Sequence, residues 1–203
     1  MSSKSKSFFW MGVAGAAMLA LIVFLRLKGF LEAGDELIIK SMEGVPGWLS
    51  NLFAAVTYLG ATETAVVLTL IGAVLFWKYR GAKQAFFFAA VVAFTRVITF
   101  ILKEILGLPR PVLGLEEEGF GFPSGHASFI VSFFAGLYFL GGFTKSRLYA
   151  IVFIVVGSLV CVSRVVLNVH FASDVVGGIL VGITIPLFLL AWYESGGVAN
   201  VKS

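Results

Sequence analysis

The sequence predicts an all-α integral membrane protein, a single domain over residues 1–203 built as a bundle of six transmembrane helices. Composition is the first reason. Hydrophobic residues make up 59% of the 203 residues and charged residues only 13%, whereas soluble domains carry about 25% charged residues. The mean hydropathy of the chain is +1.00. The second reason is that apolar segments close to the length of a transmembrane helix, about 20 residues, recur along the chain.

Six apolar segments account for the expected helices. Residues 8–25 follow a short start rich in Lys and Ser and so resemble a signal peptide. The segment is nevertheless long enough to span a bilayer, and no clear small-residue cleavage site follows it. We therefore expect a retained first helix. The other helices are expected at residues 62–77, 85–106, 127–143, 148–163 and 175–193.

Residues 29–50 connect the first two expected spans and carry most of the acidic residues of the N-terminal quarter. Within this connection, four apolar side chains fall on roughly one side of a helix: Leu37, Ile38, Ile39 and Met42. This pattern predicts a short interfacial helix over residues 35–42. We expect it to pack outside the bundle as a structural element.

Basic residues predict the orientation in the membrane. Lys and Arg without any Asp or Glu occupy the N-terminus, residues 78–83 and residues 145–147, which share one side of a six-span protein. Because short cytoplasmic loops are enriched in Lys and Arg, both termini are expected in the cytoplasm. The net charge of +4 contains no long basic run, so no nucleic-acid partner is expected. The sequence indicates no obligate protein partner either.

The polar residues that remain gather at the opposite, outer ends of the spans. The chain contains two histidines, His126 and His170, and both lie there. The cations Lys103, Arg110 and Arg164 fall at the same side, against the positive-inside bias. A lone histidine is more often structural, and single cations at span ends often only reach toward the interface. Together, however, costly charges at one membrane face indicate a site for an anion such as phosphate.

The spacing of these residues suggests how a phosphate would react. His170 and Asp174 are four residues apart and share a face if helical, so the carboxylate can fix the imidazole tautomer. The other ring nitrogen could then attack phosphorus. His126 is placed to protonate a leaving oxygen. Ser124 and Gly125 open a helix whose N-terminal amides can bind an anion, with Gly125 allowing close approach. Three cations stabilise negative charge in a transition state: Lys103, Arg110 and Arg164.

Three segments resemble the motifs of the type 2 phosphatidic acid phosphatase superfamily: Lys103-x6-Arg110-Pro111, Pro123-Ser124-Gly125-His126 and Ser163-Arg164-x5-His170-x3-Asp174. The resemblance implies that His126 is the general acid, His170 the nucleophile and Asp174 the residue that orients it. It further implies phosphate binding by Lys103, Arg110, Ser124, Gly125 and Arg164, with no metal and no other cofactor. Soluble vanadate-containing haloperoxidases share this constellation, but six spans argue against them.

The expected function is metal-independent hydrolysis of a lipid phosphate at the outer face of a bacterial plasma membrane. Phosphatidylglycerophosphate is the favoured substrate. Undecaprenyl pyrophosphate is the close alternative, and broad activity on phosphatidic acid is another. A protein that binds or transports lipid phosphate without cleaving it is a different class. The pair of histidines and Asp174 favours an enzyme, since binding alone needs only cations.

Three further features are expected to have structural roles and not catalytic ones. Arg96 falls within the third span, where a charge costs about 2.5–3.5 kcal/mol on insertion scales, and Glu63 is its expected ion-pair partner. A substrate role for Arg96 is the lesser alternative. Residues 116–118 are expected to form a solvated loop tip, and Cys161 to be a packing residue.

Overall fold

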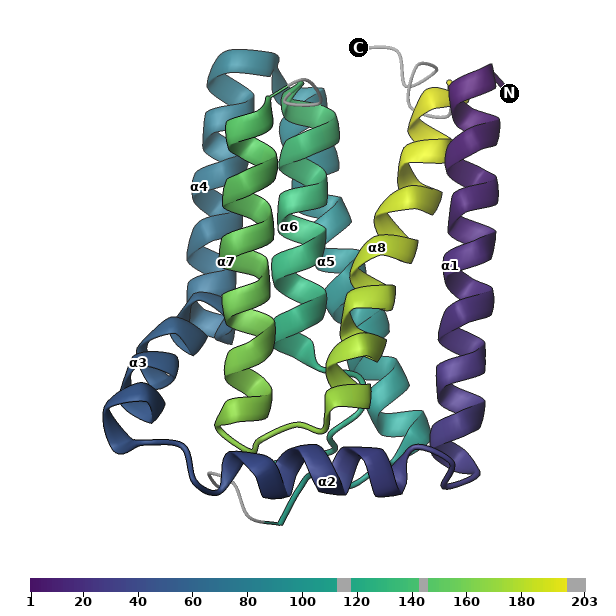
Figure 1. Cartoon of the computed structure of the whole chain (residues 1–203). Coiled ribbons are helices and arrows are strands. Elements are labelled where there is room, and N and C mark those ends of the chain that lie inside the picture. The colour runs from purple at the N-terminus through teal and green to yellow at the C-terminus, as the bar shows by residue number, and fades with distance from the viewer. Residues whose placement is uncertain (113–117, 143–145, 197–203) are drawn as a thin grey trace.

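The computed structural model describes residues 1–112, 118–142 and 146–196, and within these ranges it is helical without strands. Six long helices run along a common direction, and two short ones lie across one end (Figure 1). The helices are α1 (Ser3–Leu27), α2 (Glu32–Met42), α3 (Gly47–Thr57), α4 (Thr62–Arg80), α5 (Ala82–Leu106), α6 (Gly125–Gly141), α7 (Arg147–Val166) and α8 (Ala172–Glu194), with a 3-10 turn, η1, at Tyr58–Gly60.

The six expected spans coincide with the six long helices. By length and composition α1, α4, α5, α7 and α8 are apolar enough to cross a membrane, and α6 is a shorter apolar helix of 17 residues. Most observed helices extend a few residues beyond the predicted apolar cores, because the polar ends of a helix contribute no hydropathy. The number of membrane crossings stays a prediction.

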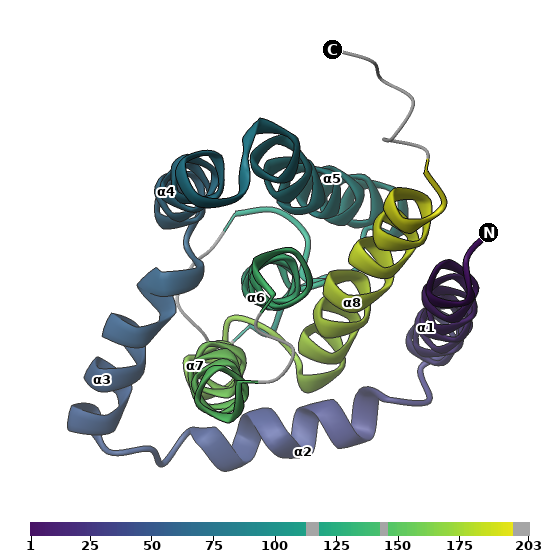
Figure 2. The same cartoon turned by 90° about the horizontal axis from the view of Figure 1, so that it is seen from above.

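Helix α6 forms the centre of the bundle, with α4, α5, α7 and α8 around it (Figure 2). Its contact with α8 is unusually close. A Cβ atom on Gly182 would lie 2.8 Å from the Ser128 carbonyl oxygen, and one on Gly178 would collide with the Ser124 carbonyl oxygen. Because glycine has no side chain, the α8 backbone can pack directly on the first turns of α6. The starts of these two helices are thereby held together.

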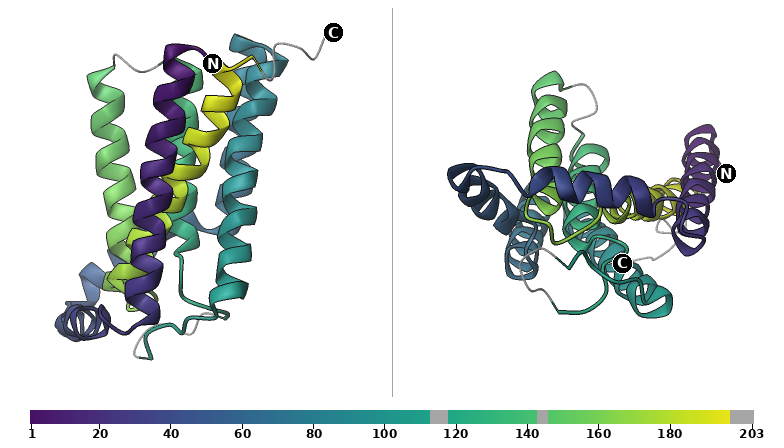
Figure 3. Two further views of the ribbon diagram at one scale, coloured as in Figure 1. Left: turned by 90° about the vertical axis from the view of Figure 1, so that its right-hand side faces the viewer. Right: turned by 60° about the horizontal axis from the view of Figure 1, so that its bottom comes forward.

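Helix α1 packs beside α8 on the outside of the bundle (Figure 3). Near its start, the Ser5 hydroxyl donates a hydrogen bond of 2.7 Å to the Ala191 carbonyl oxygen. Farther along, a Cβ atom on Gly12 would lie 3.0 Å from the Phe188 ring, so the two helices approach closely there too. This antiparallel pairing carries the last turn of α1 to the end where α8 begins.

The predicted short helix is present as α2, and its four apolar side chains do not share one buried face. Asp35 and Ile39 are buried, whereas Leu37 is 70% exposed and Ile38 is also exposed. Asp35 faces inward because it has buried hydrogen-bonding partners, which a pattern of apolar residues does not reveal. Helix α3 was not predicted at all. Its apolar sequence merges with that of α4, and only η1 separates them.

The two ends of the bundle differ in what they hold. The start of α1, the turn between α4 and α5, the start of α7 and the end of α8 lie at one end. The predicted cationic segments therefore share that end, although Lys145 lies outside the described residues. Helices α2 and α3 and the starts of α6 and α8 lie at the other end (Figure 3). All motif residues gather at this second end.

Candidate active site

A cavity of about 200 Å³ opens among α4, α5 and α6 at the motif end of the bundle. Its walls are Thr62, Arg96, Thr99, Phe100, Lys103, Arg110, Gly125, His126 and His170. Of the predicted site residues, the structure thus brings Lys103, Arg110, Gly125, His126 and His170 together around one space. Ser124, Arg164 and Asp174 lie behind this wall.

His170 is held in the short connection between α7 and α8. Its backbone N–H donates to the Arg164 carbonyl oxygen at 3.1 Å. Its side chain is buried, with Nδ1 lying 3.4 Å from Oδ2 of Asp174 and Nε2 lying 3.1 Å from Nη1 of Arg110. A guanidinium has donors but no acceptor, so Nε2 carries the lone pair and Nδ1 carries the proton. The ring therefore turns the lone pair of Nε2 toward Arg110, a residue of the cavity wall.

Lys103 and Arg110 line the cavity and also donate hydrogen bonds to carbonyl oxygens of the loop before α6. Arg110 donates to the carbonyl oxygens of Val169 at 3.0 Å and of Gly119 at 3.1 Å. Lys103 Nζ donates to the carbonyl oxygens of Phe120 at 2.7 Å and Gly121 at 3.1 Å. Phosphate oxygens entering the cavity would compete with these neutral carbonyl oxygens and offer stronger, charge-assisted bonds.

His126 is the second residue of α6, on the cavity side of that helix. The η1 turn packs against its ring: a Cβ atom on Gly60 would lie 2.6 Å from Cδ2 of His126. The residue before the helix, Ser124, is extended, and its N–H donates to the Asp174 carbonyl oxygen at 2.9 Å. The Ser124 hydroxyl is buried, and no hydrogen-bond partner for it occurs among the described residues. It does not reach the cavity in this arrangement.

Arg164 lies in the last turn of α7 and is only 1% exposed. Its Nη1 donates to Oγ1 of Thr57 at 2.6 Å, which joins the motif to the end of α3. Its carbonyl oxygen receives the N–H groups of Val169 and His170. Arg164 thus shapes the loop that carries His170, and its guanidinium lies outside the cavity wall.

Asp174 is completely buried in the first turn of α8. Its Oδ2 accepts the Phe171 N–H at 3.0 Å and faces His170, as the spacing predicts. Its Oδ1 lies 3.3 Å from Nη2 of Arg26, a residue that sequence reasoning missed. Arg26 in turn lies 3.4 Å from Asp35. One signal could have identified Arg26. It is a cation in the last turn of the first span, on the membrane side where the positive-inside rule predicts few cations.

Arg96 does not pair with Glu63, so that expectation is wrong. Its Nη1 donates to the Gly125 carbonyl oxygen at 3.1 Å, and its Nη2 donates to Oγ1 of Thr62 at 2.9 Å. Thr62 and Glu63 are neighbours on α4 and point in different directions, and the threonine is the one that faces the cavity. Arg96 is therefore a third cation in the cavity wall, in addition to Lys103 and Arg110.

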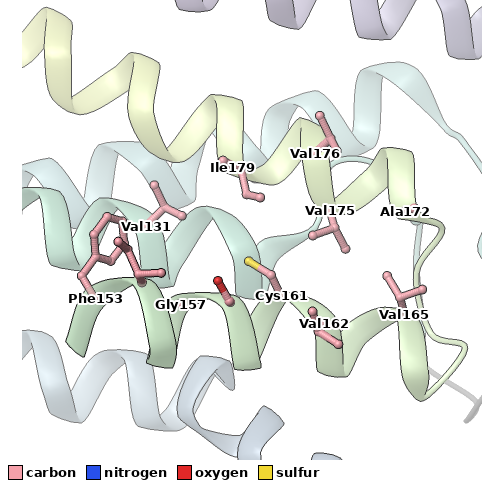
Figure 4. Close-up of a pocket in the computed structure, with 12 residues that line it drawn as sticks. Val131, Phe153, Gly157, Cys161, Val162, Val165, Ala172, Val175, Val176 and Ile179 are labelled. Carbon is pink, nitrogen blue, oxygen red and sulfur yellow. The ribbon is translucent and has the colours of Figure 1, made fainter. Parts of the chain in front are cut away.

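A second, larger cavity of about 440 Å³ lies between α7 and α8, and Figure 4 shows its lining. Valine side chains such as Val162, Val165 and Val175 dominate the wall, with Cys161 among them. Cys161 is buried, as expected of a packing residue. None of the described residues that line this cavity is charged, so they offer no cation to a phosphate.

The cavity beside His126 and His170 suits an anion and phosphoryl chemistry. Three cationic side chains line it, Arg96, Lys103 and Arg110, together with the imidazoles of His126 and His170. In the part of the chain that the structure describes, no cluster of three or more His, Cys, Asp or Glu side chains could hold a metal ion. The cations Arg96, Lys103 and Arg110 are thus the positive charges that the cavity itself presents.

Comparison with known proteins supports this chemistry. The family model of the PAP2 superfamily matches residues 84–196. Phosphatidylglycerophosphatase B of Bacillus subtilis (strain 168) is 28% identical over 174 residues, which cover 81% of this chain and 85% of the relative. The crystal structure of a transmembrane PAP2-type phosphatidylglycerolphosphate phosphatase from Bacillus subtilis superposes with a TM-score of 0.81 at 26% identity, covering 94% of this chain and 98% of the other.

A more distant solved structure, Aquifex aeolicus LpxE, superposes with a TM-score of 0.63 at 21% identity. It covers 76% of this chain and 93% of its own, and indicates a shared fold. The match to a transmembrane structure confirms the predicted class, an all-helical membrane bundle.

Proposed function

Because the chain belongs to the PAP2 superfamily and is a membrane lipid phosphatase, we propose that it hydrolyses phosphatidylglycerophosphate to phosphatidylglycerol through a phosphohistidine at His170. The observation that carries the proposal is the orientation of His170. Its protonated Nδ1 faces Asp174, and its Nε2 lone pair faces Arg110 in the cavity wall. That is the arrangement a nitrogen nucleophile requires.

The reaction proceeds in two displacements. In the first, His170 Nε2 forms a bond to phosphorus while the ester P–O bond breaks, and His126 gives a proton to the leaving glycerol oxygen. In the second, His126 takes a proton from water, the water oxygen bonds to phosphorus, and the N–P bond breaks to release inorganic phosphate. Asp174 stabilises the imidazolium character of His170 in both steps. Lys103 and Arg110 stabilise the charge on the phosphoryl oxygens.

The cavity fits a headgroup whose lipid chains stay in the bilayer. A volume of about 200 Å³ holds a glycerol phosphate but no acyl chain. Phe100, which lines the cavity, is 62% exposed on the outer surface of α5. The headgroup would therefore enter from the side of the bundle, through the space between α4 and α5. The related Bacillus subtilis proteins, named for phosphatidylglycerophosphate, support this choice of substrate.

Undecaprenyl pyrophosphate is the second candidate, because Arg96 supplies a cation that its inner phosphate would need. A second phosphate next to the one attacked needs a cation of its own, and the sequence motifs supply none. Arg96 lies beside His126, the proposed acid for the leaving group. It can meet the phosphodiester of phosphatidylglycerophosphate or the inner phosphate of a pyrophosphate. Comparison of kcat/KM for the two lipids decides between them, since that ratio reports differential binding of the transition state.

We place the cavity at the outer face of a bacterial plasma membrane. The cationic segments lie at the opposite end of the bundle, and such segments are retained in the cytoplasm. A lipid presented in the outer leaflet would then meet the cavity directly.

The test of the reaction is to trap the intermediate. Purified protein is mixed with lipid labelled in the terminal phosphate and quenched in base, in which a phosphohistidine survives. We expect label on the wild-type chain, lability of that label in acid, and no label or phosphate release with His170→Ala. Phosphate release by His170→Ala at a rate near that of the wild type would refute the nucleophile. Lipid binding without any phosphate release by the wild type would indicate a binding or transport protein instead.

A further inference from the structure

A buried network of charged groups extends from Asp174 away from the cavity. It consists of Asp174, Arg26 and Asp35, contributed by α8, α1 and α2, and Ser173 completes it. The exposed fractions of the three charged residues are 0%, 6% and 4%. None of them lines the cavity. Buried charges are costly unless paired, so three of them behind a catalytic histidine require a reason.

We propose that Arg26 is a positioning residue for His170, acting through Asp174. This inference rests on the proposed function of that site. The two oxygens of Asp174 have separate tasks. Oδ2 faces Nδ1 of His170 and the Phe171 N–H, while Oδ1 faces Arg26 Nη2 at 3.3 Å. Rotation of the carboxylate would break both sets of contacts at once. Arg26 therefore fixes the plane of the carboxylate that fixes the imidazole.

Arg26 is itself held on several sides. Its Nη1 lies 3.4 Å from Oδ2 of Asp35, and its Cζ lies 4.7 Å from the centre of the Phe171 ring. The planar guanidinium thus bridges two carboxylates while it packs on an aromatic ring. A lysine ammonium is a point charge and lacks this fork, so it cannot reproduce the bridge.

Asp35 connects the network to the first turn of α8. Its Oδ1 accepts the Ser173 N–H at 3.0 Å, and its Oδ2 accepts the Ser173 hydroxyl. A carboxylate at a helix N-terminus is stabilised by unpaired amides and by the helix dipole. These amides offset part of the cost of burying the Asp35 carboxylate, and Arg26 lies between the carboxylates of Asp35 and Asp174. Helix α2 is in this way bonded to the turn that carries the catalytic aspartate.

The expected kinetic effect is on turnover and not on substrate binding. Arg26→Met should lower kcat about 10–100-fold, comparable to the loss when the hydrogen-bond partner of a metal-ligating residue is removed. KM should change less than threefold, because Arg26 does not touch the cavity. Arg26→Lys should recover part of the loss by restoring the charge. Asp35→Asn should lower kcat less than Arg26→Met does. Lys28→Met is the matched control, since Lys28 is an exposed cation two residues away.

A double-mutant cycle separates positioning from a purely structural role. If Arg26 acts through Asp174, adding Arg26→Met to Asp174→Asn should cost less than a further twofold in kcat. Fold losses that multiply in the double variant would overturn the proposal, as would an Arg26→Met kcat within twofold of the wild type. If Arg26→Met does not fold, the same cycle is run with Arg26→Lys.

These outcomes can be told apart from failure of the proposed function. The cycle uses phosphate release only and does not depend on which nitrogen attacks. A wild-type enzyme that releases phosphate without forming a phosphohistidine would refute the mechanism at His170, while the coupling between Arg26 and Asp174 would still be measured.

Discussion

Nη1 of Arg110 lies 3.1 Å from Nε2 of His170 and 3.0 Å from the Val169 carbonyl oxygen. In this state the cation covers the nitrogen that is proposed to attack. A phosphate entering the cavity would draw the guanidinium to its own oxygens through bidentate, charge-assisted bonds. The lone pair of His170 would then face phosphorus. Arg110 would thus have two successive partners, and substrate binding would uncover the proposed nucleophile.

The proposed general acid can be tested with leaving groups of different strength. His126→Ala should slow hydrolysis of a lipid phosphate severely, by about 10²–10⁴-fold, because the alkoxide must leave without a proton. The loss should be much smaller on an aryl phosphate, whose phenolate leaves readily. Steady-state rates on both substrates provide the measurement. Equal losses on the two would reject the assignment of His126.

Arg96 should act selectively on substrates with a second phosphate. Arg96→Gln should lower kcat/KM for phosphatidylglycerophosphate about tenfold, or about 1.4 kcal/mol, because the second phosphate loses its cation. Phosphatidic acid, which has a single phosphate, should lose less than threefold. A uniform loss on both lipids would show that Arg96 supports the site only through Gly125 and Thr62.

Gly60 should be intolerant of even one methyl group. In Gly60→Ala the new carbon would lie 2.6 Å from the His126 ring, and one of them must move. We expect a loss of kcat of tenfold or more, since a displacement of about 1 Å can cost 10²-fold. Gly44→Ala is the control, because no other atom lies within 4 Å of the added carbon there. Wild-type kcat in Gly60→Ala would contradict the packing of η1 on His126.

Activity should persist in excess EDTA and be inhibited by vanadate. The positive charges in the cavity wall come from side chains, and vanadate can adopt the trigonal-bipyramidal geometry of the transition state between His170 and the leaving oxygen. Phosphate release is followed with each reagent. Loss of turnover on chelation that a divalent metal restores would overturn a metal-independent mechanism.

The orientation can be tested with two cysteines in a Cys161→Ser background. The two variants are Val112→Cys and Ala82→Cys. Val112 lies at the motif end and is 97% exposed, and Ala82 lies at the opposite end. On intact cells, an impermeant thiol reagent should label the first and spare the second. The reverse pattern would place the cavity in the cytoplasm.

The sequence was most informative where chemistry and local periodicity coincide. Each of the six predicted apolar segments corresponds to a long helix. Motif residues far apart in the sequence line one cavity because successive helices reverse direction. His170 and Asp174 do lie together, but His170 precedes α8, so the two do not share a helical face. Helix α3 was missed because Tyr58–Gly60 contains neither proline nor charge to mark a break.

The sequence also could not predict which charged residues pair across long distances in the chain. Nothing in the local pattern distinguishes a buried Arg26 from a cation that reaches the interface, nor Asp35 from a solvated acid. Arg26, for example, is 148 residues away from its partner Asp174 in the sequence. Likewise, Arg96 was expected to meet the nearest acidic side chain, although hydrogen bonds to a carbonyl and a hydroxyl satisfy it.

The pairing of Arg26 with Asp174 has a consequence for biogenesis. At translation rates of about 5–20 residues per second, 148 residues correspond to roughly 7–30 s. During that interval the first helix has entered the bilayer while its partner is still unmade. Arg26 and Asp35 must stay hydrated at the membrane surface until α8 is inserted. A nascent chain that stalls before α8 would therefore leave Arg26 without its contact to Asp174.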